Sequence, residues 1–151
     1  MTLLQSAGLA AVATNALEEA AFLFVEQADS VDLPLDRAVI ASIGFAAPAR
    51  GLLRVVTDAD GARLLAANVL GLEGDDPDVG ESSVAAVGEL ANIVAGLLLV
   101  EVSAPGALTA IDIPKVGRDA RAARPACAVS FRTAEGYPFR FELSWEDGHV
   151  A

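Results

Sequence analysis

Residues 82–100 read SSVAAVGELANIVAGLLLV, and this stretch decides the fold. Its spacing predicts one long helix, because at roughly 100° per residue the apolar side chains gather in a single broad arc. The arc contains Val87, Leu90, Ala91, Val94, Leu97 and Leu98, and the opposite stripe contains Ala85, Glu89, Asn92 and Gly96. A helix this apolar is expected to be largely buried. The stripe carries one carboxylate and one amide among small residues, which suits the close approach of a partner.

The composition of the whole chain predicts one globular domain over residues 1–151. A chain of this length buries about two-thirds of its unfolded surface, and the 54% of apolar residues argues against disorder. The formal net charge is −11, and Lys115 is the only lysine. A nucleic-acid binder needs a basic surface, and anionic lipid would repel this chain, so we expect neither partner. A partner protein fits the charge better.

Cysteine usage and the N-terminal sequence predict a cytoplasmic protein. Cys127 is the only cysteine, so it cannot form an internal disulfide, which agrees with a reducing compartment. No Lys or Arg precedes Arg37, whereas a secretory signal begins with basic residues. The longest uninterrupted apolar run, 93–100, is far shorter than the roughly 20 residues of a membrane span.

The N-terminal half predicts a helix and then two strands. Apolar residues over 3–27 keep three- and four-residue spacings, which indicates a helix; they are Leu9, Val12, Ala13, Ala16, Ala20, Leu23 and Phe24. Alternation predicts strands at 37–45 and 52–57.

A second helix is expected from Asp58 to a stop at Gly71. The acidic segment 72–82 has no apolar pattern, and we expect a solvated loop whose last residues favour the start of the next helix. Its acidic residues do not have the spacing of a calcium loop.

The C-terminal region contains the clearest strand pattern. After a possible short strand at 108–113, residues alternate from Cys127 to Phe131 and again from Phe139 to Trp145, with a turn at 135–136. This pattern predicts a β-hairpin, with Cys127 as a core residue. Helices mixed with antiparallel hairpins predict an α+β fold, an antiparallel sheet with long helices packed on one face.

A faint internal echo relates the first helix to the central one. A shift of 70 residues lays 16–22 over 86–92, so Glu19 falls on Glu89 and Phe22 falls on Asn92. Both chance and a true degenerate repeat remain open.

Few side chains in this sequence could carry out chemistry. His149 is the only histidine and lies near the C-terminus, so we do not expect a Ser–His or Cys–His nucleophile pair. One His and one Cys cannot form a usual zinc site. No Gly-rich phosphate loop or dinucleotide fingerprint occurs. The sequence therefore predicts no metal or cofactor site of its own.

Glu89 and Asn92 remain. At i and i+3 on a helix their Cβ atoms lie roughly 5–6 Å apart on one face. A carboxylate there can hold a cation while the amide orients a water, which is the help that phosphoryl transfer needs. On these two residues alone, a buried amide satisfied by a loop beside a surface carboxylate remains an alternative.

The wider motif resembles that of a known family. Residues 89–96 have the form E-x-x-N-x-x-x-G inside GELANIVAG, which resembles the CheX branch of the CheC/CheX/FliY family of chemotaxis phosphatases. The resemblance extends more loosely to ARGLLRVVTDADGARLLAANVLG at 49–71. It implies a phosphatase, a hydrolase acting on the aspartyl phosphate of a CheY-like response regulator in two-component signalling.

The resemblance also implies residue roles. Glu89 would contact the active-site lysine of the receiver domain, and Asn92 would orient the attacking water. Mg²⁺ would be supplied by the receiver. Ala85, Gly88 and Gly96 would form the floor against which the receiver docks.

Phe22 stands where a second amide would be, so the resemblance implies one catalytic centre, as in CheX-like rather than CheC-like members. It also implies a homodimer. Leu97 departs from the family pattern, because relatives often carry a polar residue there.

Two other readings stay open. One is a non-catalytic module of the same fold that binds a receiver as an adaptor, and the other is a structural protein with an accidental motif. Retention of both Glu89 and Asn92 favours the enzyme. The sequence does not identify the receiver, or whether the pathway is chemotaxis or another two-component system.

Overall fold

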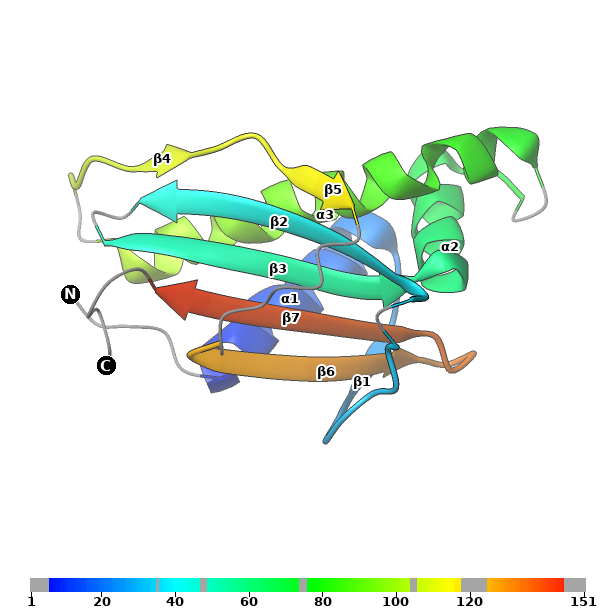
Figure 1. Ribbon diagram of the computed structural model, residues 1–151, viewed down its shortest axis with the longest axis horizontal. Helices are drawn as coiled ribbons and strands as arrows, with labels where there is room; N and C mark the ends of the chain where they lie inside the picture. The colour runs from blue at the N-terminus through cyan, green and yellow to red at the C-terminus, as the bar shows by residue number, and fades with distance from the viewer. Residues whose placement is uncertain are drawn as a thin grey trace.

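The described part of the chain forms an antiparallel sheet with helices on one face (Figure 1). The computed structural model describes residues 6–34, 36–46, 49–73, 76–103, 106–117 and 125–145. The helices are α1 (Ser6–Ala21), α2 (Ala59–Leu70) and α3 (Pro77–Val102). The strands are β1 (Val25–Ala28), β2 (Ala38–Ala46), β3 (Arg50–Asp58), β4 (Ala110–Ile111), β5 (Lys115–Gly117), β6 (Cys127–Thr133) and β7 (Pro138–Trp145). The predicted α+β class is confirmed.

Apart from the additional strand β4 in the second half, the sheet is built from two halves with a similar order of elements. The strand order is β1-β6-β7-β3-β2, and both β4 and β5 pair with the outer edge of β2. The first half runs α1-β1-β2-β3, and the second contains α3-β5-β6-β7. The short strand of each half pairs with the hairpin of the other half: β1 pairs with β6 of the β6–β7 hairpin, and β5 pairs with β2 of the β2–β3 hairpin. The arrangement makes α1 and α3 equivalent, which supports a true repeat between 16–22 and 86–92.

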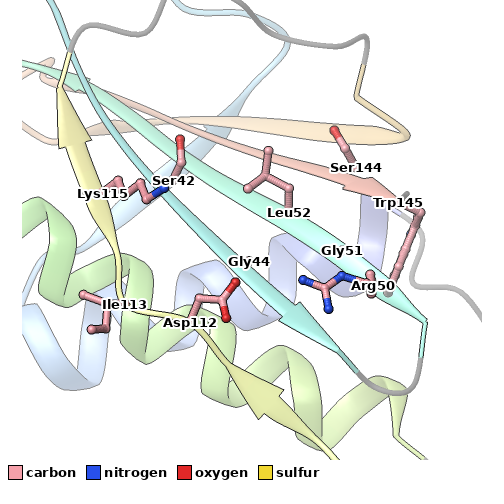
Figure 2. Close-up of a pocket in the computed structure, with 10 residues that line it drawn as sticks. All are labelled: Ser42, Gly44, Arg50, Gly51, Leu52, Asp112, Ile113, Lys115, Ser144 and Trp145. Carbon is pink, nitrogen blue, oxygen red and sulfur yellow. The ribbon is translucent and has the colours of Figure 1, made fainter. Parts of the chain in front are cut away.

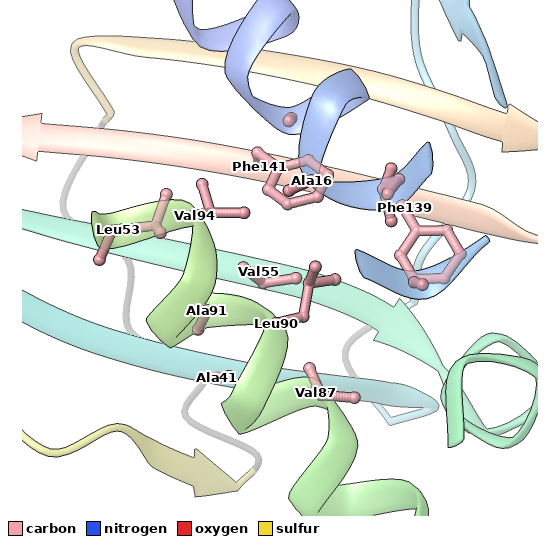
Figure 3. Close-up of a cluster of buried hydrophobic side chains, with 14 of the residues drawn as sticks. Ala16, Ala41, Leu53, Val55, Val87, Leu90, Ala91, Val94, Phe139 and Phe141 are labelled. Carbon is pink, nitrogen blue, oxygen red and sulfur yellow. The ribbon is translucent and has the colours of Figure 1, made fainter. Parts of the chain in front are cut away.

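The core lies between α3, α1 and the helix-facing side of the sheet (Figure 3). Val87, Leu90 and Val94 of α3 point toward the strands, where they meet a layer that includes Phe139 and Phe141. All five side chains are at most 2% exposed. Burial of an apolar side chain of this size stabilises the fold by about 1.5–3 kcal/mol. The predicted apolar arc is therefore the core face of α3, although Leu97 is only partly buried.

The predicted boundaries of α2 are confirmed. The Asp58 side chain accepts a hydrogen bond from the Gly61 backbone N–H at 2.8 Å, which caps the first turn. Gly71 ends the helix in the left-handed conformation, with φ of 70°, where the absence of a Cβ avoids a steric penalty.

The central helix begins earlier than the sequence predicts. α3 starts at Pro77 inside the acidic segment that we expected to be a loop, and the Asp76 side chain accepts from the backbone N–H of Asp78 at 2.9 Å. Pro at the first helical position is preorganised for a helix start. The Asp76 cap and Pro77 mark the start of α3 without any repeat of apolar residues, so the apolar spacing did not reveal this start.

The first helix ends earlier than predicted. α1 stops at Ala21, Phe22 adopts a φ of 55°, and the Leu23 N–H donates to the Leu17 carbonyl at 2.8 Å. This bond satisfies one of the carbonyls at the C-terminal end of the helix. Val25–Ala28 then forms β1, and Phe24, one of the apolar residues whose spacing indicated the helix, is 74% exposed. The prediction of helix for 22–27 was wrong, and residues 3–5 lie outside the described residues.

Two further predictions concern strands. The C-terminal hairpin is confirmed, with Phe131 opposite Phe139. The possible strand at 108–113 is reduced to β4, and β5 was not predicted.

Helix α3 is also long and apolar enough to cross a membrane, with a mean hydropathy of 2.0 over its most apolar window. Its apolar face packs on the sheet here, and the core helix of a soluble protein passes the same test, so a single such helix is weak evidence for a span.

Candidate functional site

Glu89 and Asn92 lie exposed in the middle of α3, although the residues between them, Leu90 and Ala91, are buried. Their spacing puts both side chains on the outer face of the helix. Neither side chain has a hydrogen-bond or ion-pair partner among the described residues. The fold therefore leaves the polar atoms of both groups available to another molecule.

The predicted docking residues fall in two different environments. Ala85 is exposed, and Gly96 is partly exposed, one turn beyond Asn92 on the same face. A Cβ placed on Gly96 would meet no atom within 4 Å, so packing within the protein does not require glycine there. A glycine inside a helix costs about 1 kcal/mol relative to alanine. That cost has no explanation in the folded monomer.

Gly88, by contrast, does not belong to the exposed face. It is buried, and a Cβ there would lie 3.0 Å from Val116 Cγ2 and 3.8 Å from Pro114. Gly88 thus lets the segment around β5 lie close to α3, and the expectation that it contacts a partner does not fit this structure. Sequence periodicity could not reveal the contact, because β5 was not predicted.

The space beside Glu89 is too small for a ligand. A cavity of about 40 Å³ lies between the three helices, and its lining comprises Ala20, Ala21, Leu65, Val69, Ala86, Glu89, Leu90 and Ile93. Small-molecule sites usually have volumes of about 300–1,000 Å³. The surface around Glu89 is therefore better suited to contact with a macromolecule than with a small ligand.

The equivalent position on α1 is arranged differently. Glu19 is exposed, as Glu89 is, but Asn15 one turn earlier donates its side-chain N–H to the Glu19 carboxylate at 3.1 Å when its amide faces that group. Phe22 lies beyond the end of the helix, so it does not share a helical face with Glu19 in the way that Asn92 shares one with Glu89.

A larger hollow lies away from this site. A cavity of about 440 Å³ lies beside the β2–β3 hairpin. Figure 2 shows the charged side chains of Arg50, Asp112 and Lys115 among its lining. Its residues come from four separate segments, so no sequence motif could have predicted it. It contains neither Glu89 nor Asn92.

The titratable groups provide no rival centre among the described residues. No group of three His, Cys, Asp or Glu side chains within them could hold a metal ion. Burial raises the pKa of the Cys127 thiol above its ordinary value, which disfavours the thiolate that a nucleophile needs.

Comparison with known proteins identifies the family. A model of the family described as chemotaxis phosphatase CheX matches residues 39–130, more than half of the chain. A search of curated protein sequences found no significant match.

Solved structures support the same fold. CheX from Desulfovibrio desulfuricans matches with a TM-score of 0.67 and 22% identity, over 91% of this chain and 96% of its own. A CheX–CheY–BeF3–Mg²⁺ complex from Borrelia burgdorferi matches with a TM-score of 0.71 and 18% identity, over 92% of this chain and 96% of the matched chain. CheX from Vibrio vulnificus matches with a TM-score of 0.67 and 23% identity, over 91% of this chain and 93% of its own. The family match and the shared fold lead to one conclusion: the chain belongs to the CheX family of chemotaxis phosphatases.

Proposed function

We propose that this protein hydrolyses the aspartyl phosphate of a CheY-like receiver domain. The observation that carries the proposal is the exposed Glu89–Asn92 pair on a helix whose other side is the core of the fold. Neither polar group has a partner among the described residues, and exposed groups that remain hydrated add little to the stability of the fold. They are well suited to complete a site that another protein brings.

Asn92 would orient the attacking water. Its side-chain carbonyl accepts a hydrogen bond from the water, whose oxygen then attacks phosphorus in line with the bond to the aspartyl oxygen. The new P–O bond forms as the aspartyl P–O bond breaks, and the products are inorganic phosphate, which keeps the water's protons, and the free carboxylate. Positioning of this kind can supply much of the rate enhancement, because the transition state of phosphoryl transfer is loose.

Glu89 would hold the receiver in register by contacting its active-site lysine. A charge-assisted hydrogen bond between a carboxylate and an ammonium is about twice as strong as a neutral one. The receiver would bring the Mg²⁺ that the reaction requires. The complex of the Borrelia burgdorferi relative was solved with CheY, BeF3 and Mg²⁺, which is consistent with this division of labour.

Ala85 and Gly96 would form the floor of the docking face. Both lie on the same face of α3 as Glu89 and Asn92, and small side chains allow the loops of a partner to approach the helix backbone. The open space at Gly96 supports this role, since the fold itself leaves room for a larger residue.

We further propose a cytoplasmic homodimer that pairs at the edge formed by β4 and its flanking residues. Leu108 and Ile113 are 92% and 85% exposed beside this two-residue strand. An exposed strand edge with apolar side chains favours pairing with a second chain.

Phosphate release from phosphorylated receivers of the source organism tests the function. Wild type should accelerate release over spontaneous hydrolysis, and Asn92→Ala should abolish the acceleration while leaving binding mostly intact. Glu89→Ala should weaken both. Gln27→Ala and Glu26→Ala, which alter an exposed amide and an exposed carboxylate on β1, serve as matched controls and should behave as wild type.

The outcomes separate enzyme from adaptor. Wild type that binds a receiver without accelerating phosphate loss would identify the non-catalytic module. Unchanged activity in Asn92→Ala would refute the mechanism.

A further inference from the structure

Phe22 is the only non-glycine residue with a positive φ among the residues that the structure describes. Its φ of 55° lies in the left-handed region, which a bulky side chain rarely adopts. The position is the one that closes α1, where glycine is most common and asparagine is next. The chain therefore keeps a phenylalanine where the backbone favours glycine.

Packing does not explain the aromatic ring. Phe22 is 66% exposed, and its hydrogen bond with Asn68 involves the backbone, whose carbonyl accepts from the side-chain N–H at 3.4 Å. A strained conformation that the rest of the fold does not use is a reason to look for a function.

The location of Phe22 links it to Glu89. Ala20 and Ala21, directly before Phe22, line the small cavity that Glu89 also lines. Val69 lines the same cavity from α2, follows Asn68 in the chain and is 47% exposed. The end of α1 and Val69 thus lie on the Glu89 side of α3, and Phe22 and Val69 are exposed apolar residues there.

We propose that Phe22 is an aromatic anchor that contacts the receiver domain when Glu89 and Asn92 engage its phosphorylation site. The proposal rests on the function proposed above. Exposed aromatic side chains next to polar centres often carry a large share of binding energy, because they bury much area and lose little conformational entropy. The residues directly before Phe22 share a cavity lining with Glu89, so a partner that covers the carboxylate lies close enough to reach the ring.

Phe22→Gly tests the proposal because its two effects have opposite signs. Glycine relieves the backbone strain at the helix end, so the melting temperature should stay the same or rise by about 2–4 °C. Loss of the ring should weaken binding to the beryllofluoride-activated receiver about tenfold or more. In turnover assays KM should rise by a similar factor, while kcat changes less than about twofold.

Two further variants complete the test. Phe22→Tyr keeps the ring and should bind within about threefold of wild type. Leu52→Ala removes a partly exposed apolar side chain from the opposite face of the sheet and should leave binding unchanged.

The outcomes distinguish this inference from the function on which it rests. If Phe22→Gly binds and turns over the receiver as wild type does, the anchor is refuted and the phosphatase stands. If Phe22→Gly lowers the melting temperature, the ring has a structural role and the anchor is refuted. If wild type engages no receiver, the proposed function fails, and the anchor fails with it.

Discussion

Arg54 and Glu142 face each other across β3 and β7, with Nη1 and Oε1 2.9 Å apart and both side chains nearly buried. The second carboxylate oxygen lies 2.8 Å from Nε of Arg140. One glutamate therefore holds two arginines on the sheet face away from the helices.

Removing this carboxylate should be costly. Glu142→Ala removes the nearly buried carboxylate that both arginines contact, and we expect a loss of about 3–5 kcal/mol in the free energy of unfolding, measured in urea. Replacing Arg54 and Glu142 together by Met and Leu should cost less than the single change. A loss under about 1 kcal/mol for Glu142→Ala would contradict this account.

Gly61→Ala should also destabilise the protein. A Cβ at Gly61 would clash with Oγ1 of Thr57, a buried hydroxyl that donates to the Pro138 carbonyl at 2.7 Å. We expect the free energy of unfolding to fall by about 1–3 kcal/mol, measured by urea denaturation. Gly117→Ala is the control, because a Cβ there meets no atom within 4 Å. Equal effects of the two changes would show that the contact with Thr57 is unimportant.

Gly96→Ala should separate stability from docking. The site has room for the methyl group, so the helix should gain up to about 1 kcal/mol in stability. The same methyl group would hold a docked receiver away from α3, so affinity for the activated receiver should fall. Calorimetric melting and receiver titration measure the two effects. A variant that is more stable and binds normally would show that Gly96 is not part of the docking floor.

Phe22→Asn should not create a second catalytic centre. The residue lies past the end of α1 in a left-handed conformation, so an asparagine there does not share a helix face with Glu19. Combined with Asn92→Ala, the substitution should leave phosphate release at the spontaneous rate. Recovery of activity in the double variant would show that the end of α1 becomes helical in the complex.

The stability of the protein should fall in alkali partly because of Cys127. Burial raises the pKa of its thiol above the ordinary 9.0, so above this pH the unfolded chain loses the proton before the folded one does. The contribution of the thiol to the free energy of unfolding is therefore fully present below pH 9 and is lost as pH rises through the pKa of the folded state. Between pH 8 and pH 10, wild type should lose more stability than Cys127→Ala. Parallel pH profiles would contradict the shift.

Sequence periodicity predicted the elements that pack on the core. The apolar arc of α3, the limits of α2 and the C-terminal hairpin all follow from spacings of three, four or two residues, because those spacings reflect burial on one face. Glu89 and Asn92 stood out for the same reason, as polar exceptions on an apolar helix. The structure places both on the surface.

Features set by long-range contact could not be predicted in this way. β1 and β5 are short strands whose partners β6 and β2 come from the other half of the chain, and nothing local distinguishes them. The burial of Gly88 follows from β5. The end of α1 at Phe22 was missed because phenylalanine is an unusual residue at that position.

The order of the strands has a consequence for the chain as it is synthesised. β7 is the last described strand in the sequence, yet it lies between β3 and β6 near the middle of the sheet. Until β7 is in place, the edges of two strands remain open, and open edges recruit other chains. A nascent or clipped chain that ends before Pro138 therefore has a sheet divided down its centre. Such a chain is an aggregation hazard that chaperones and quality-control proteases would bind.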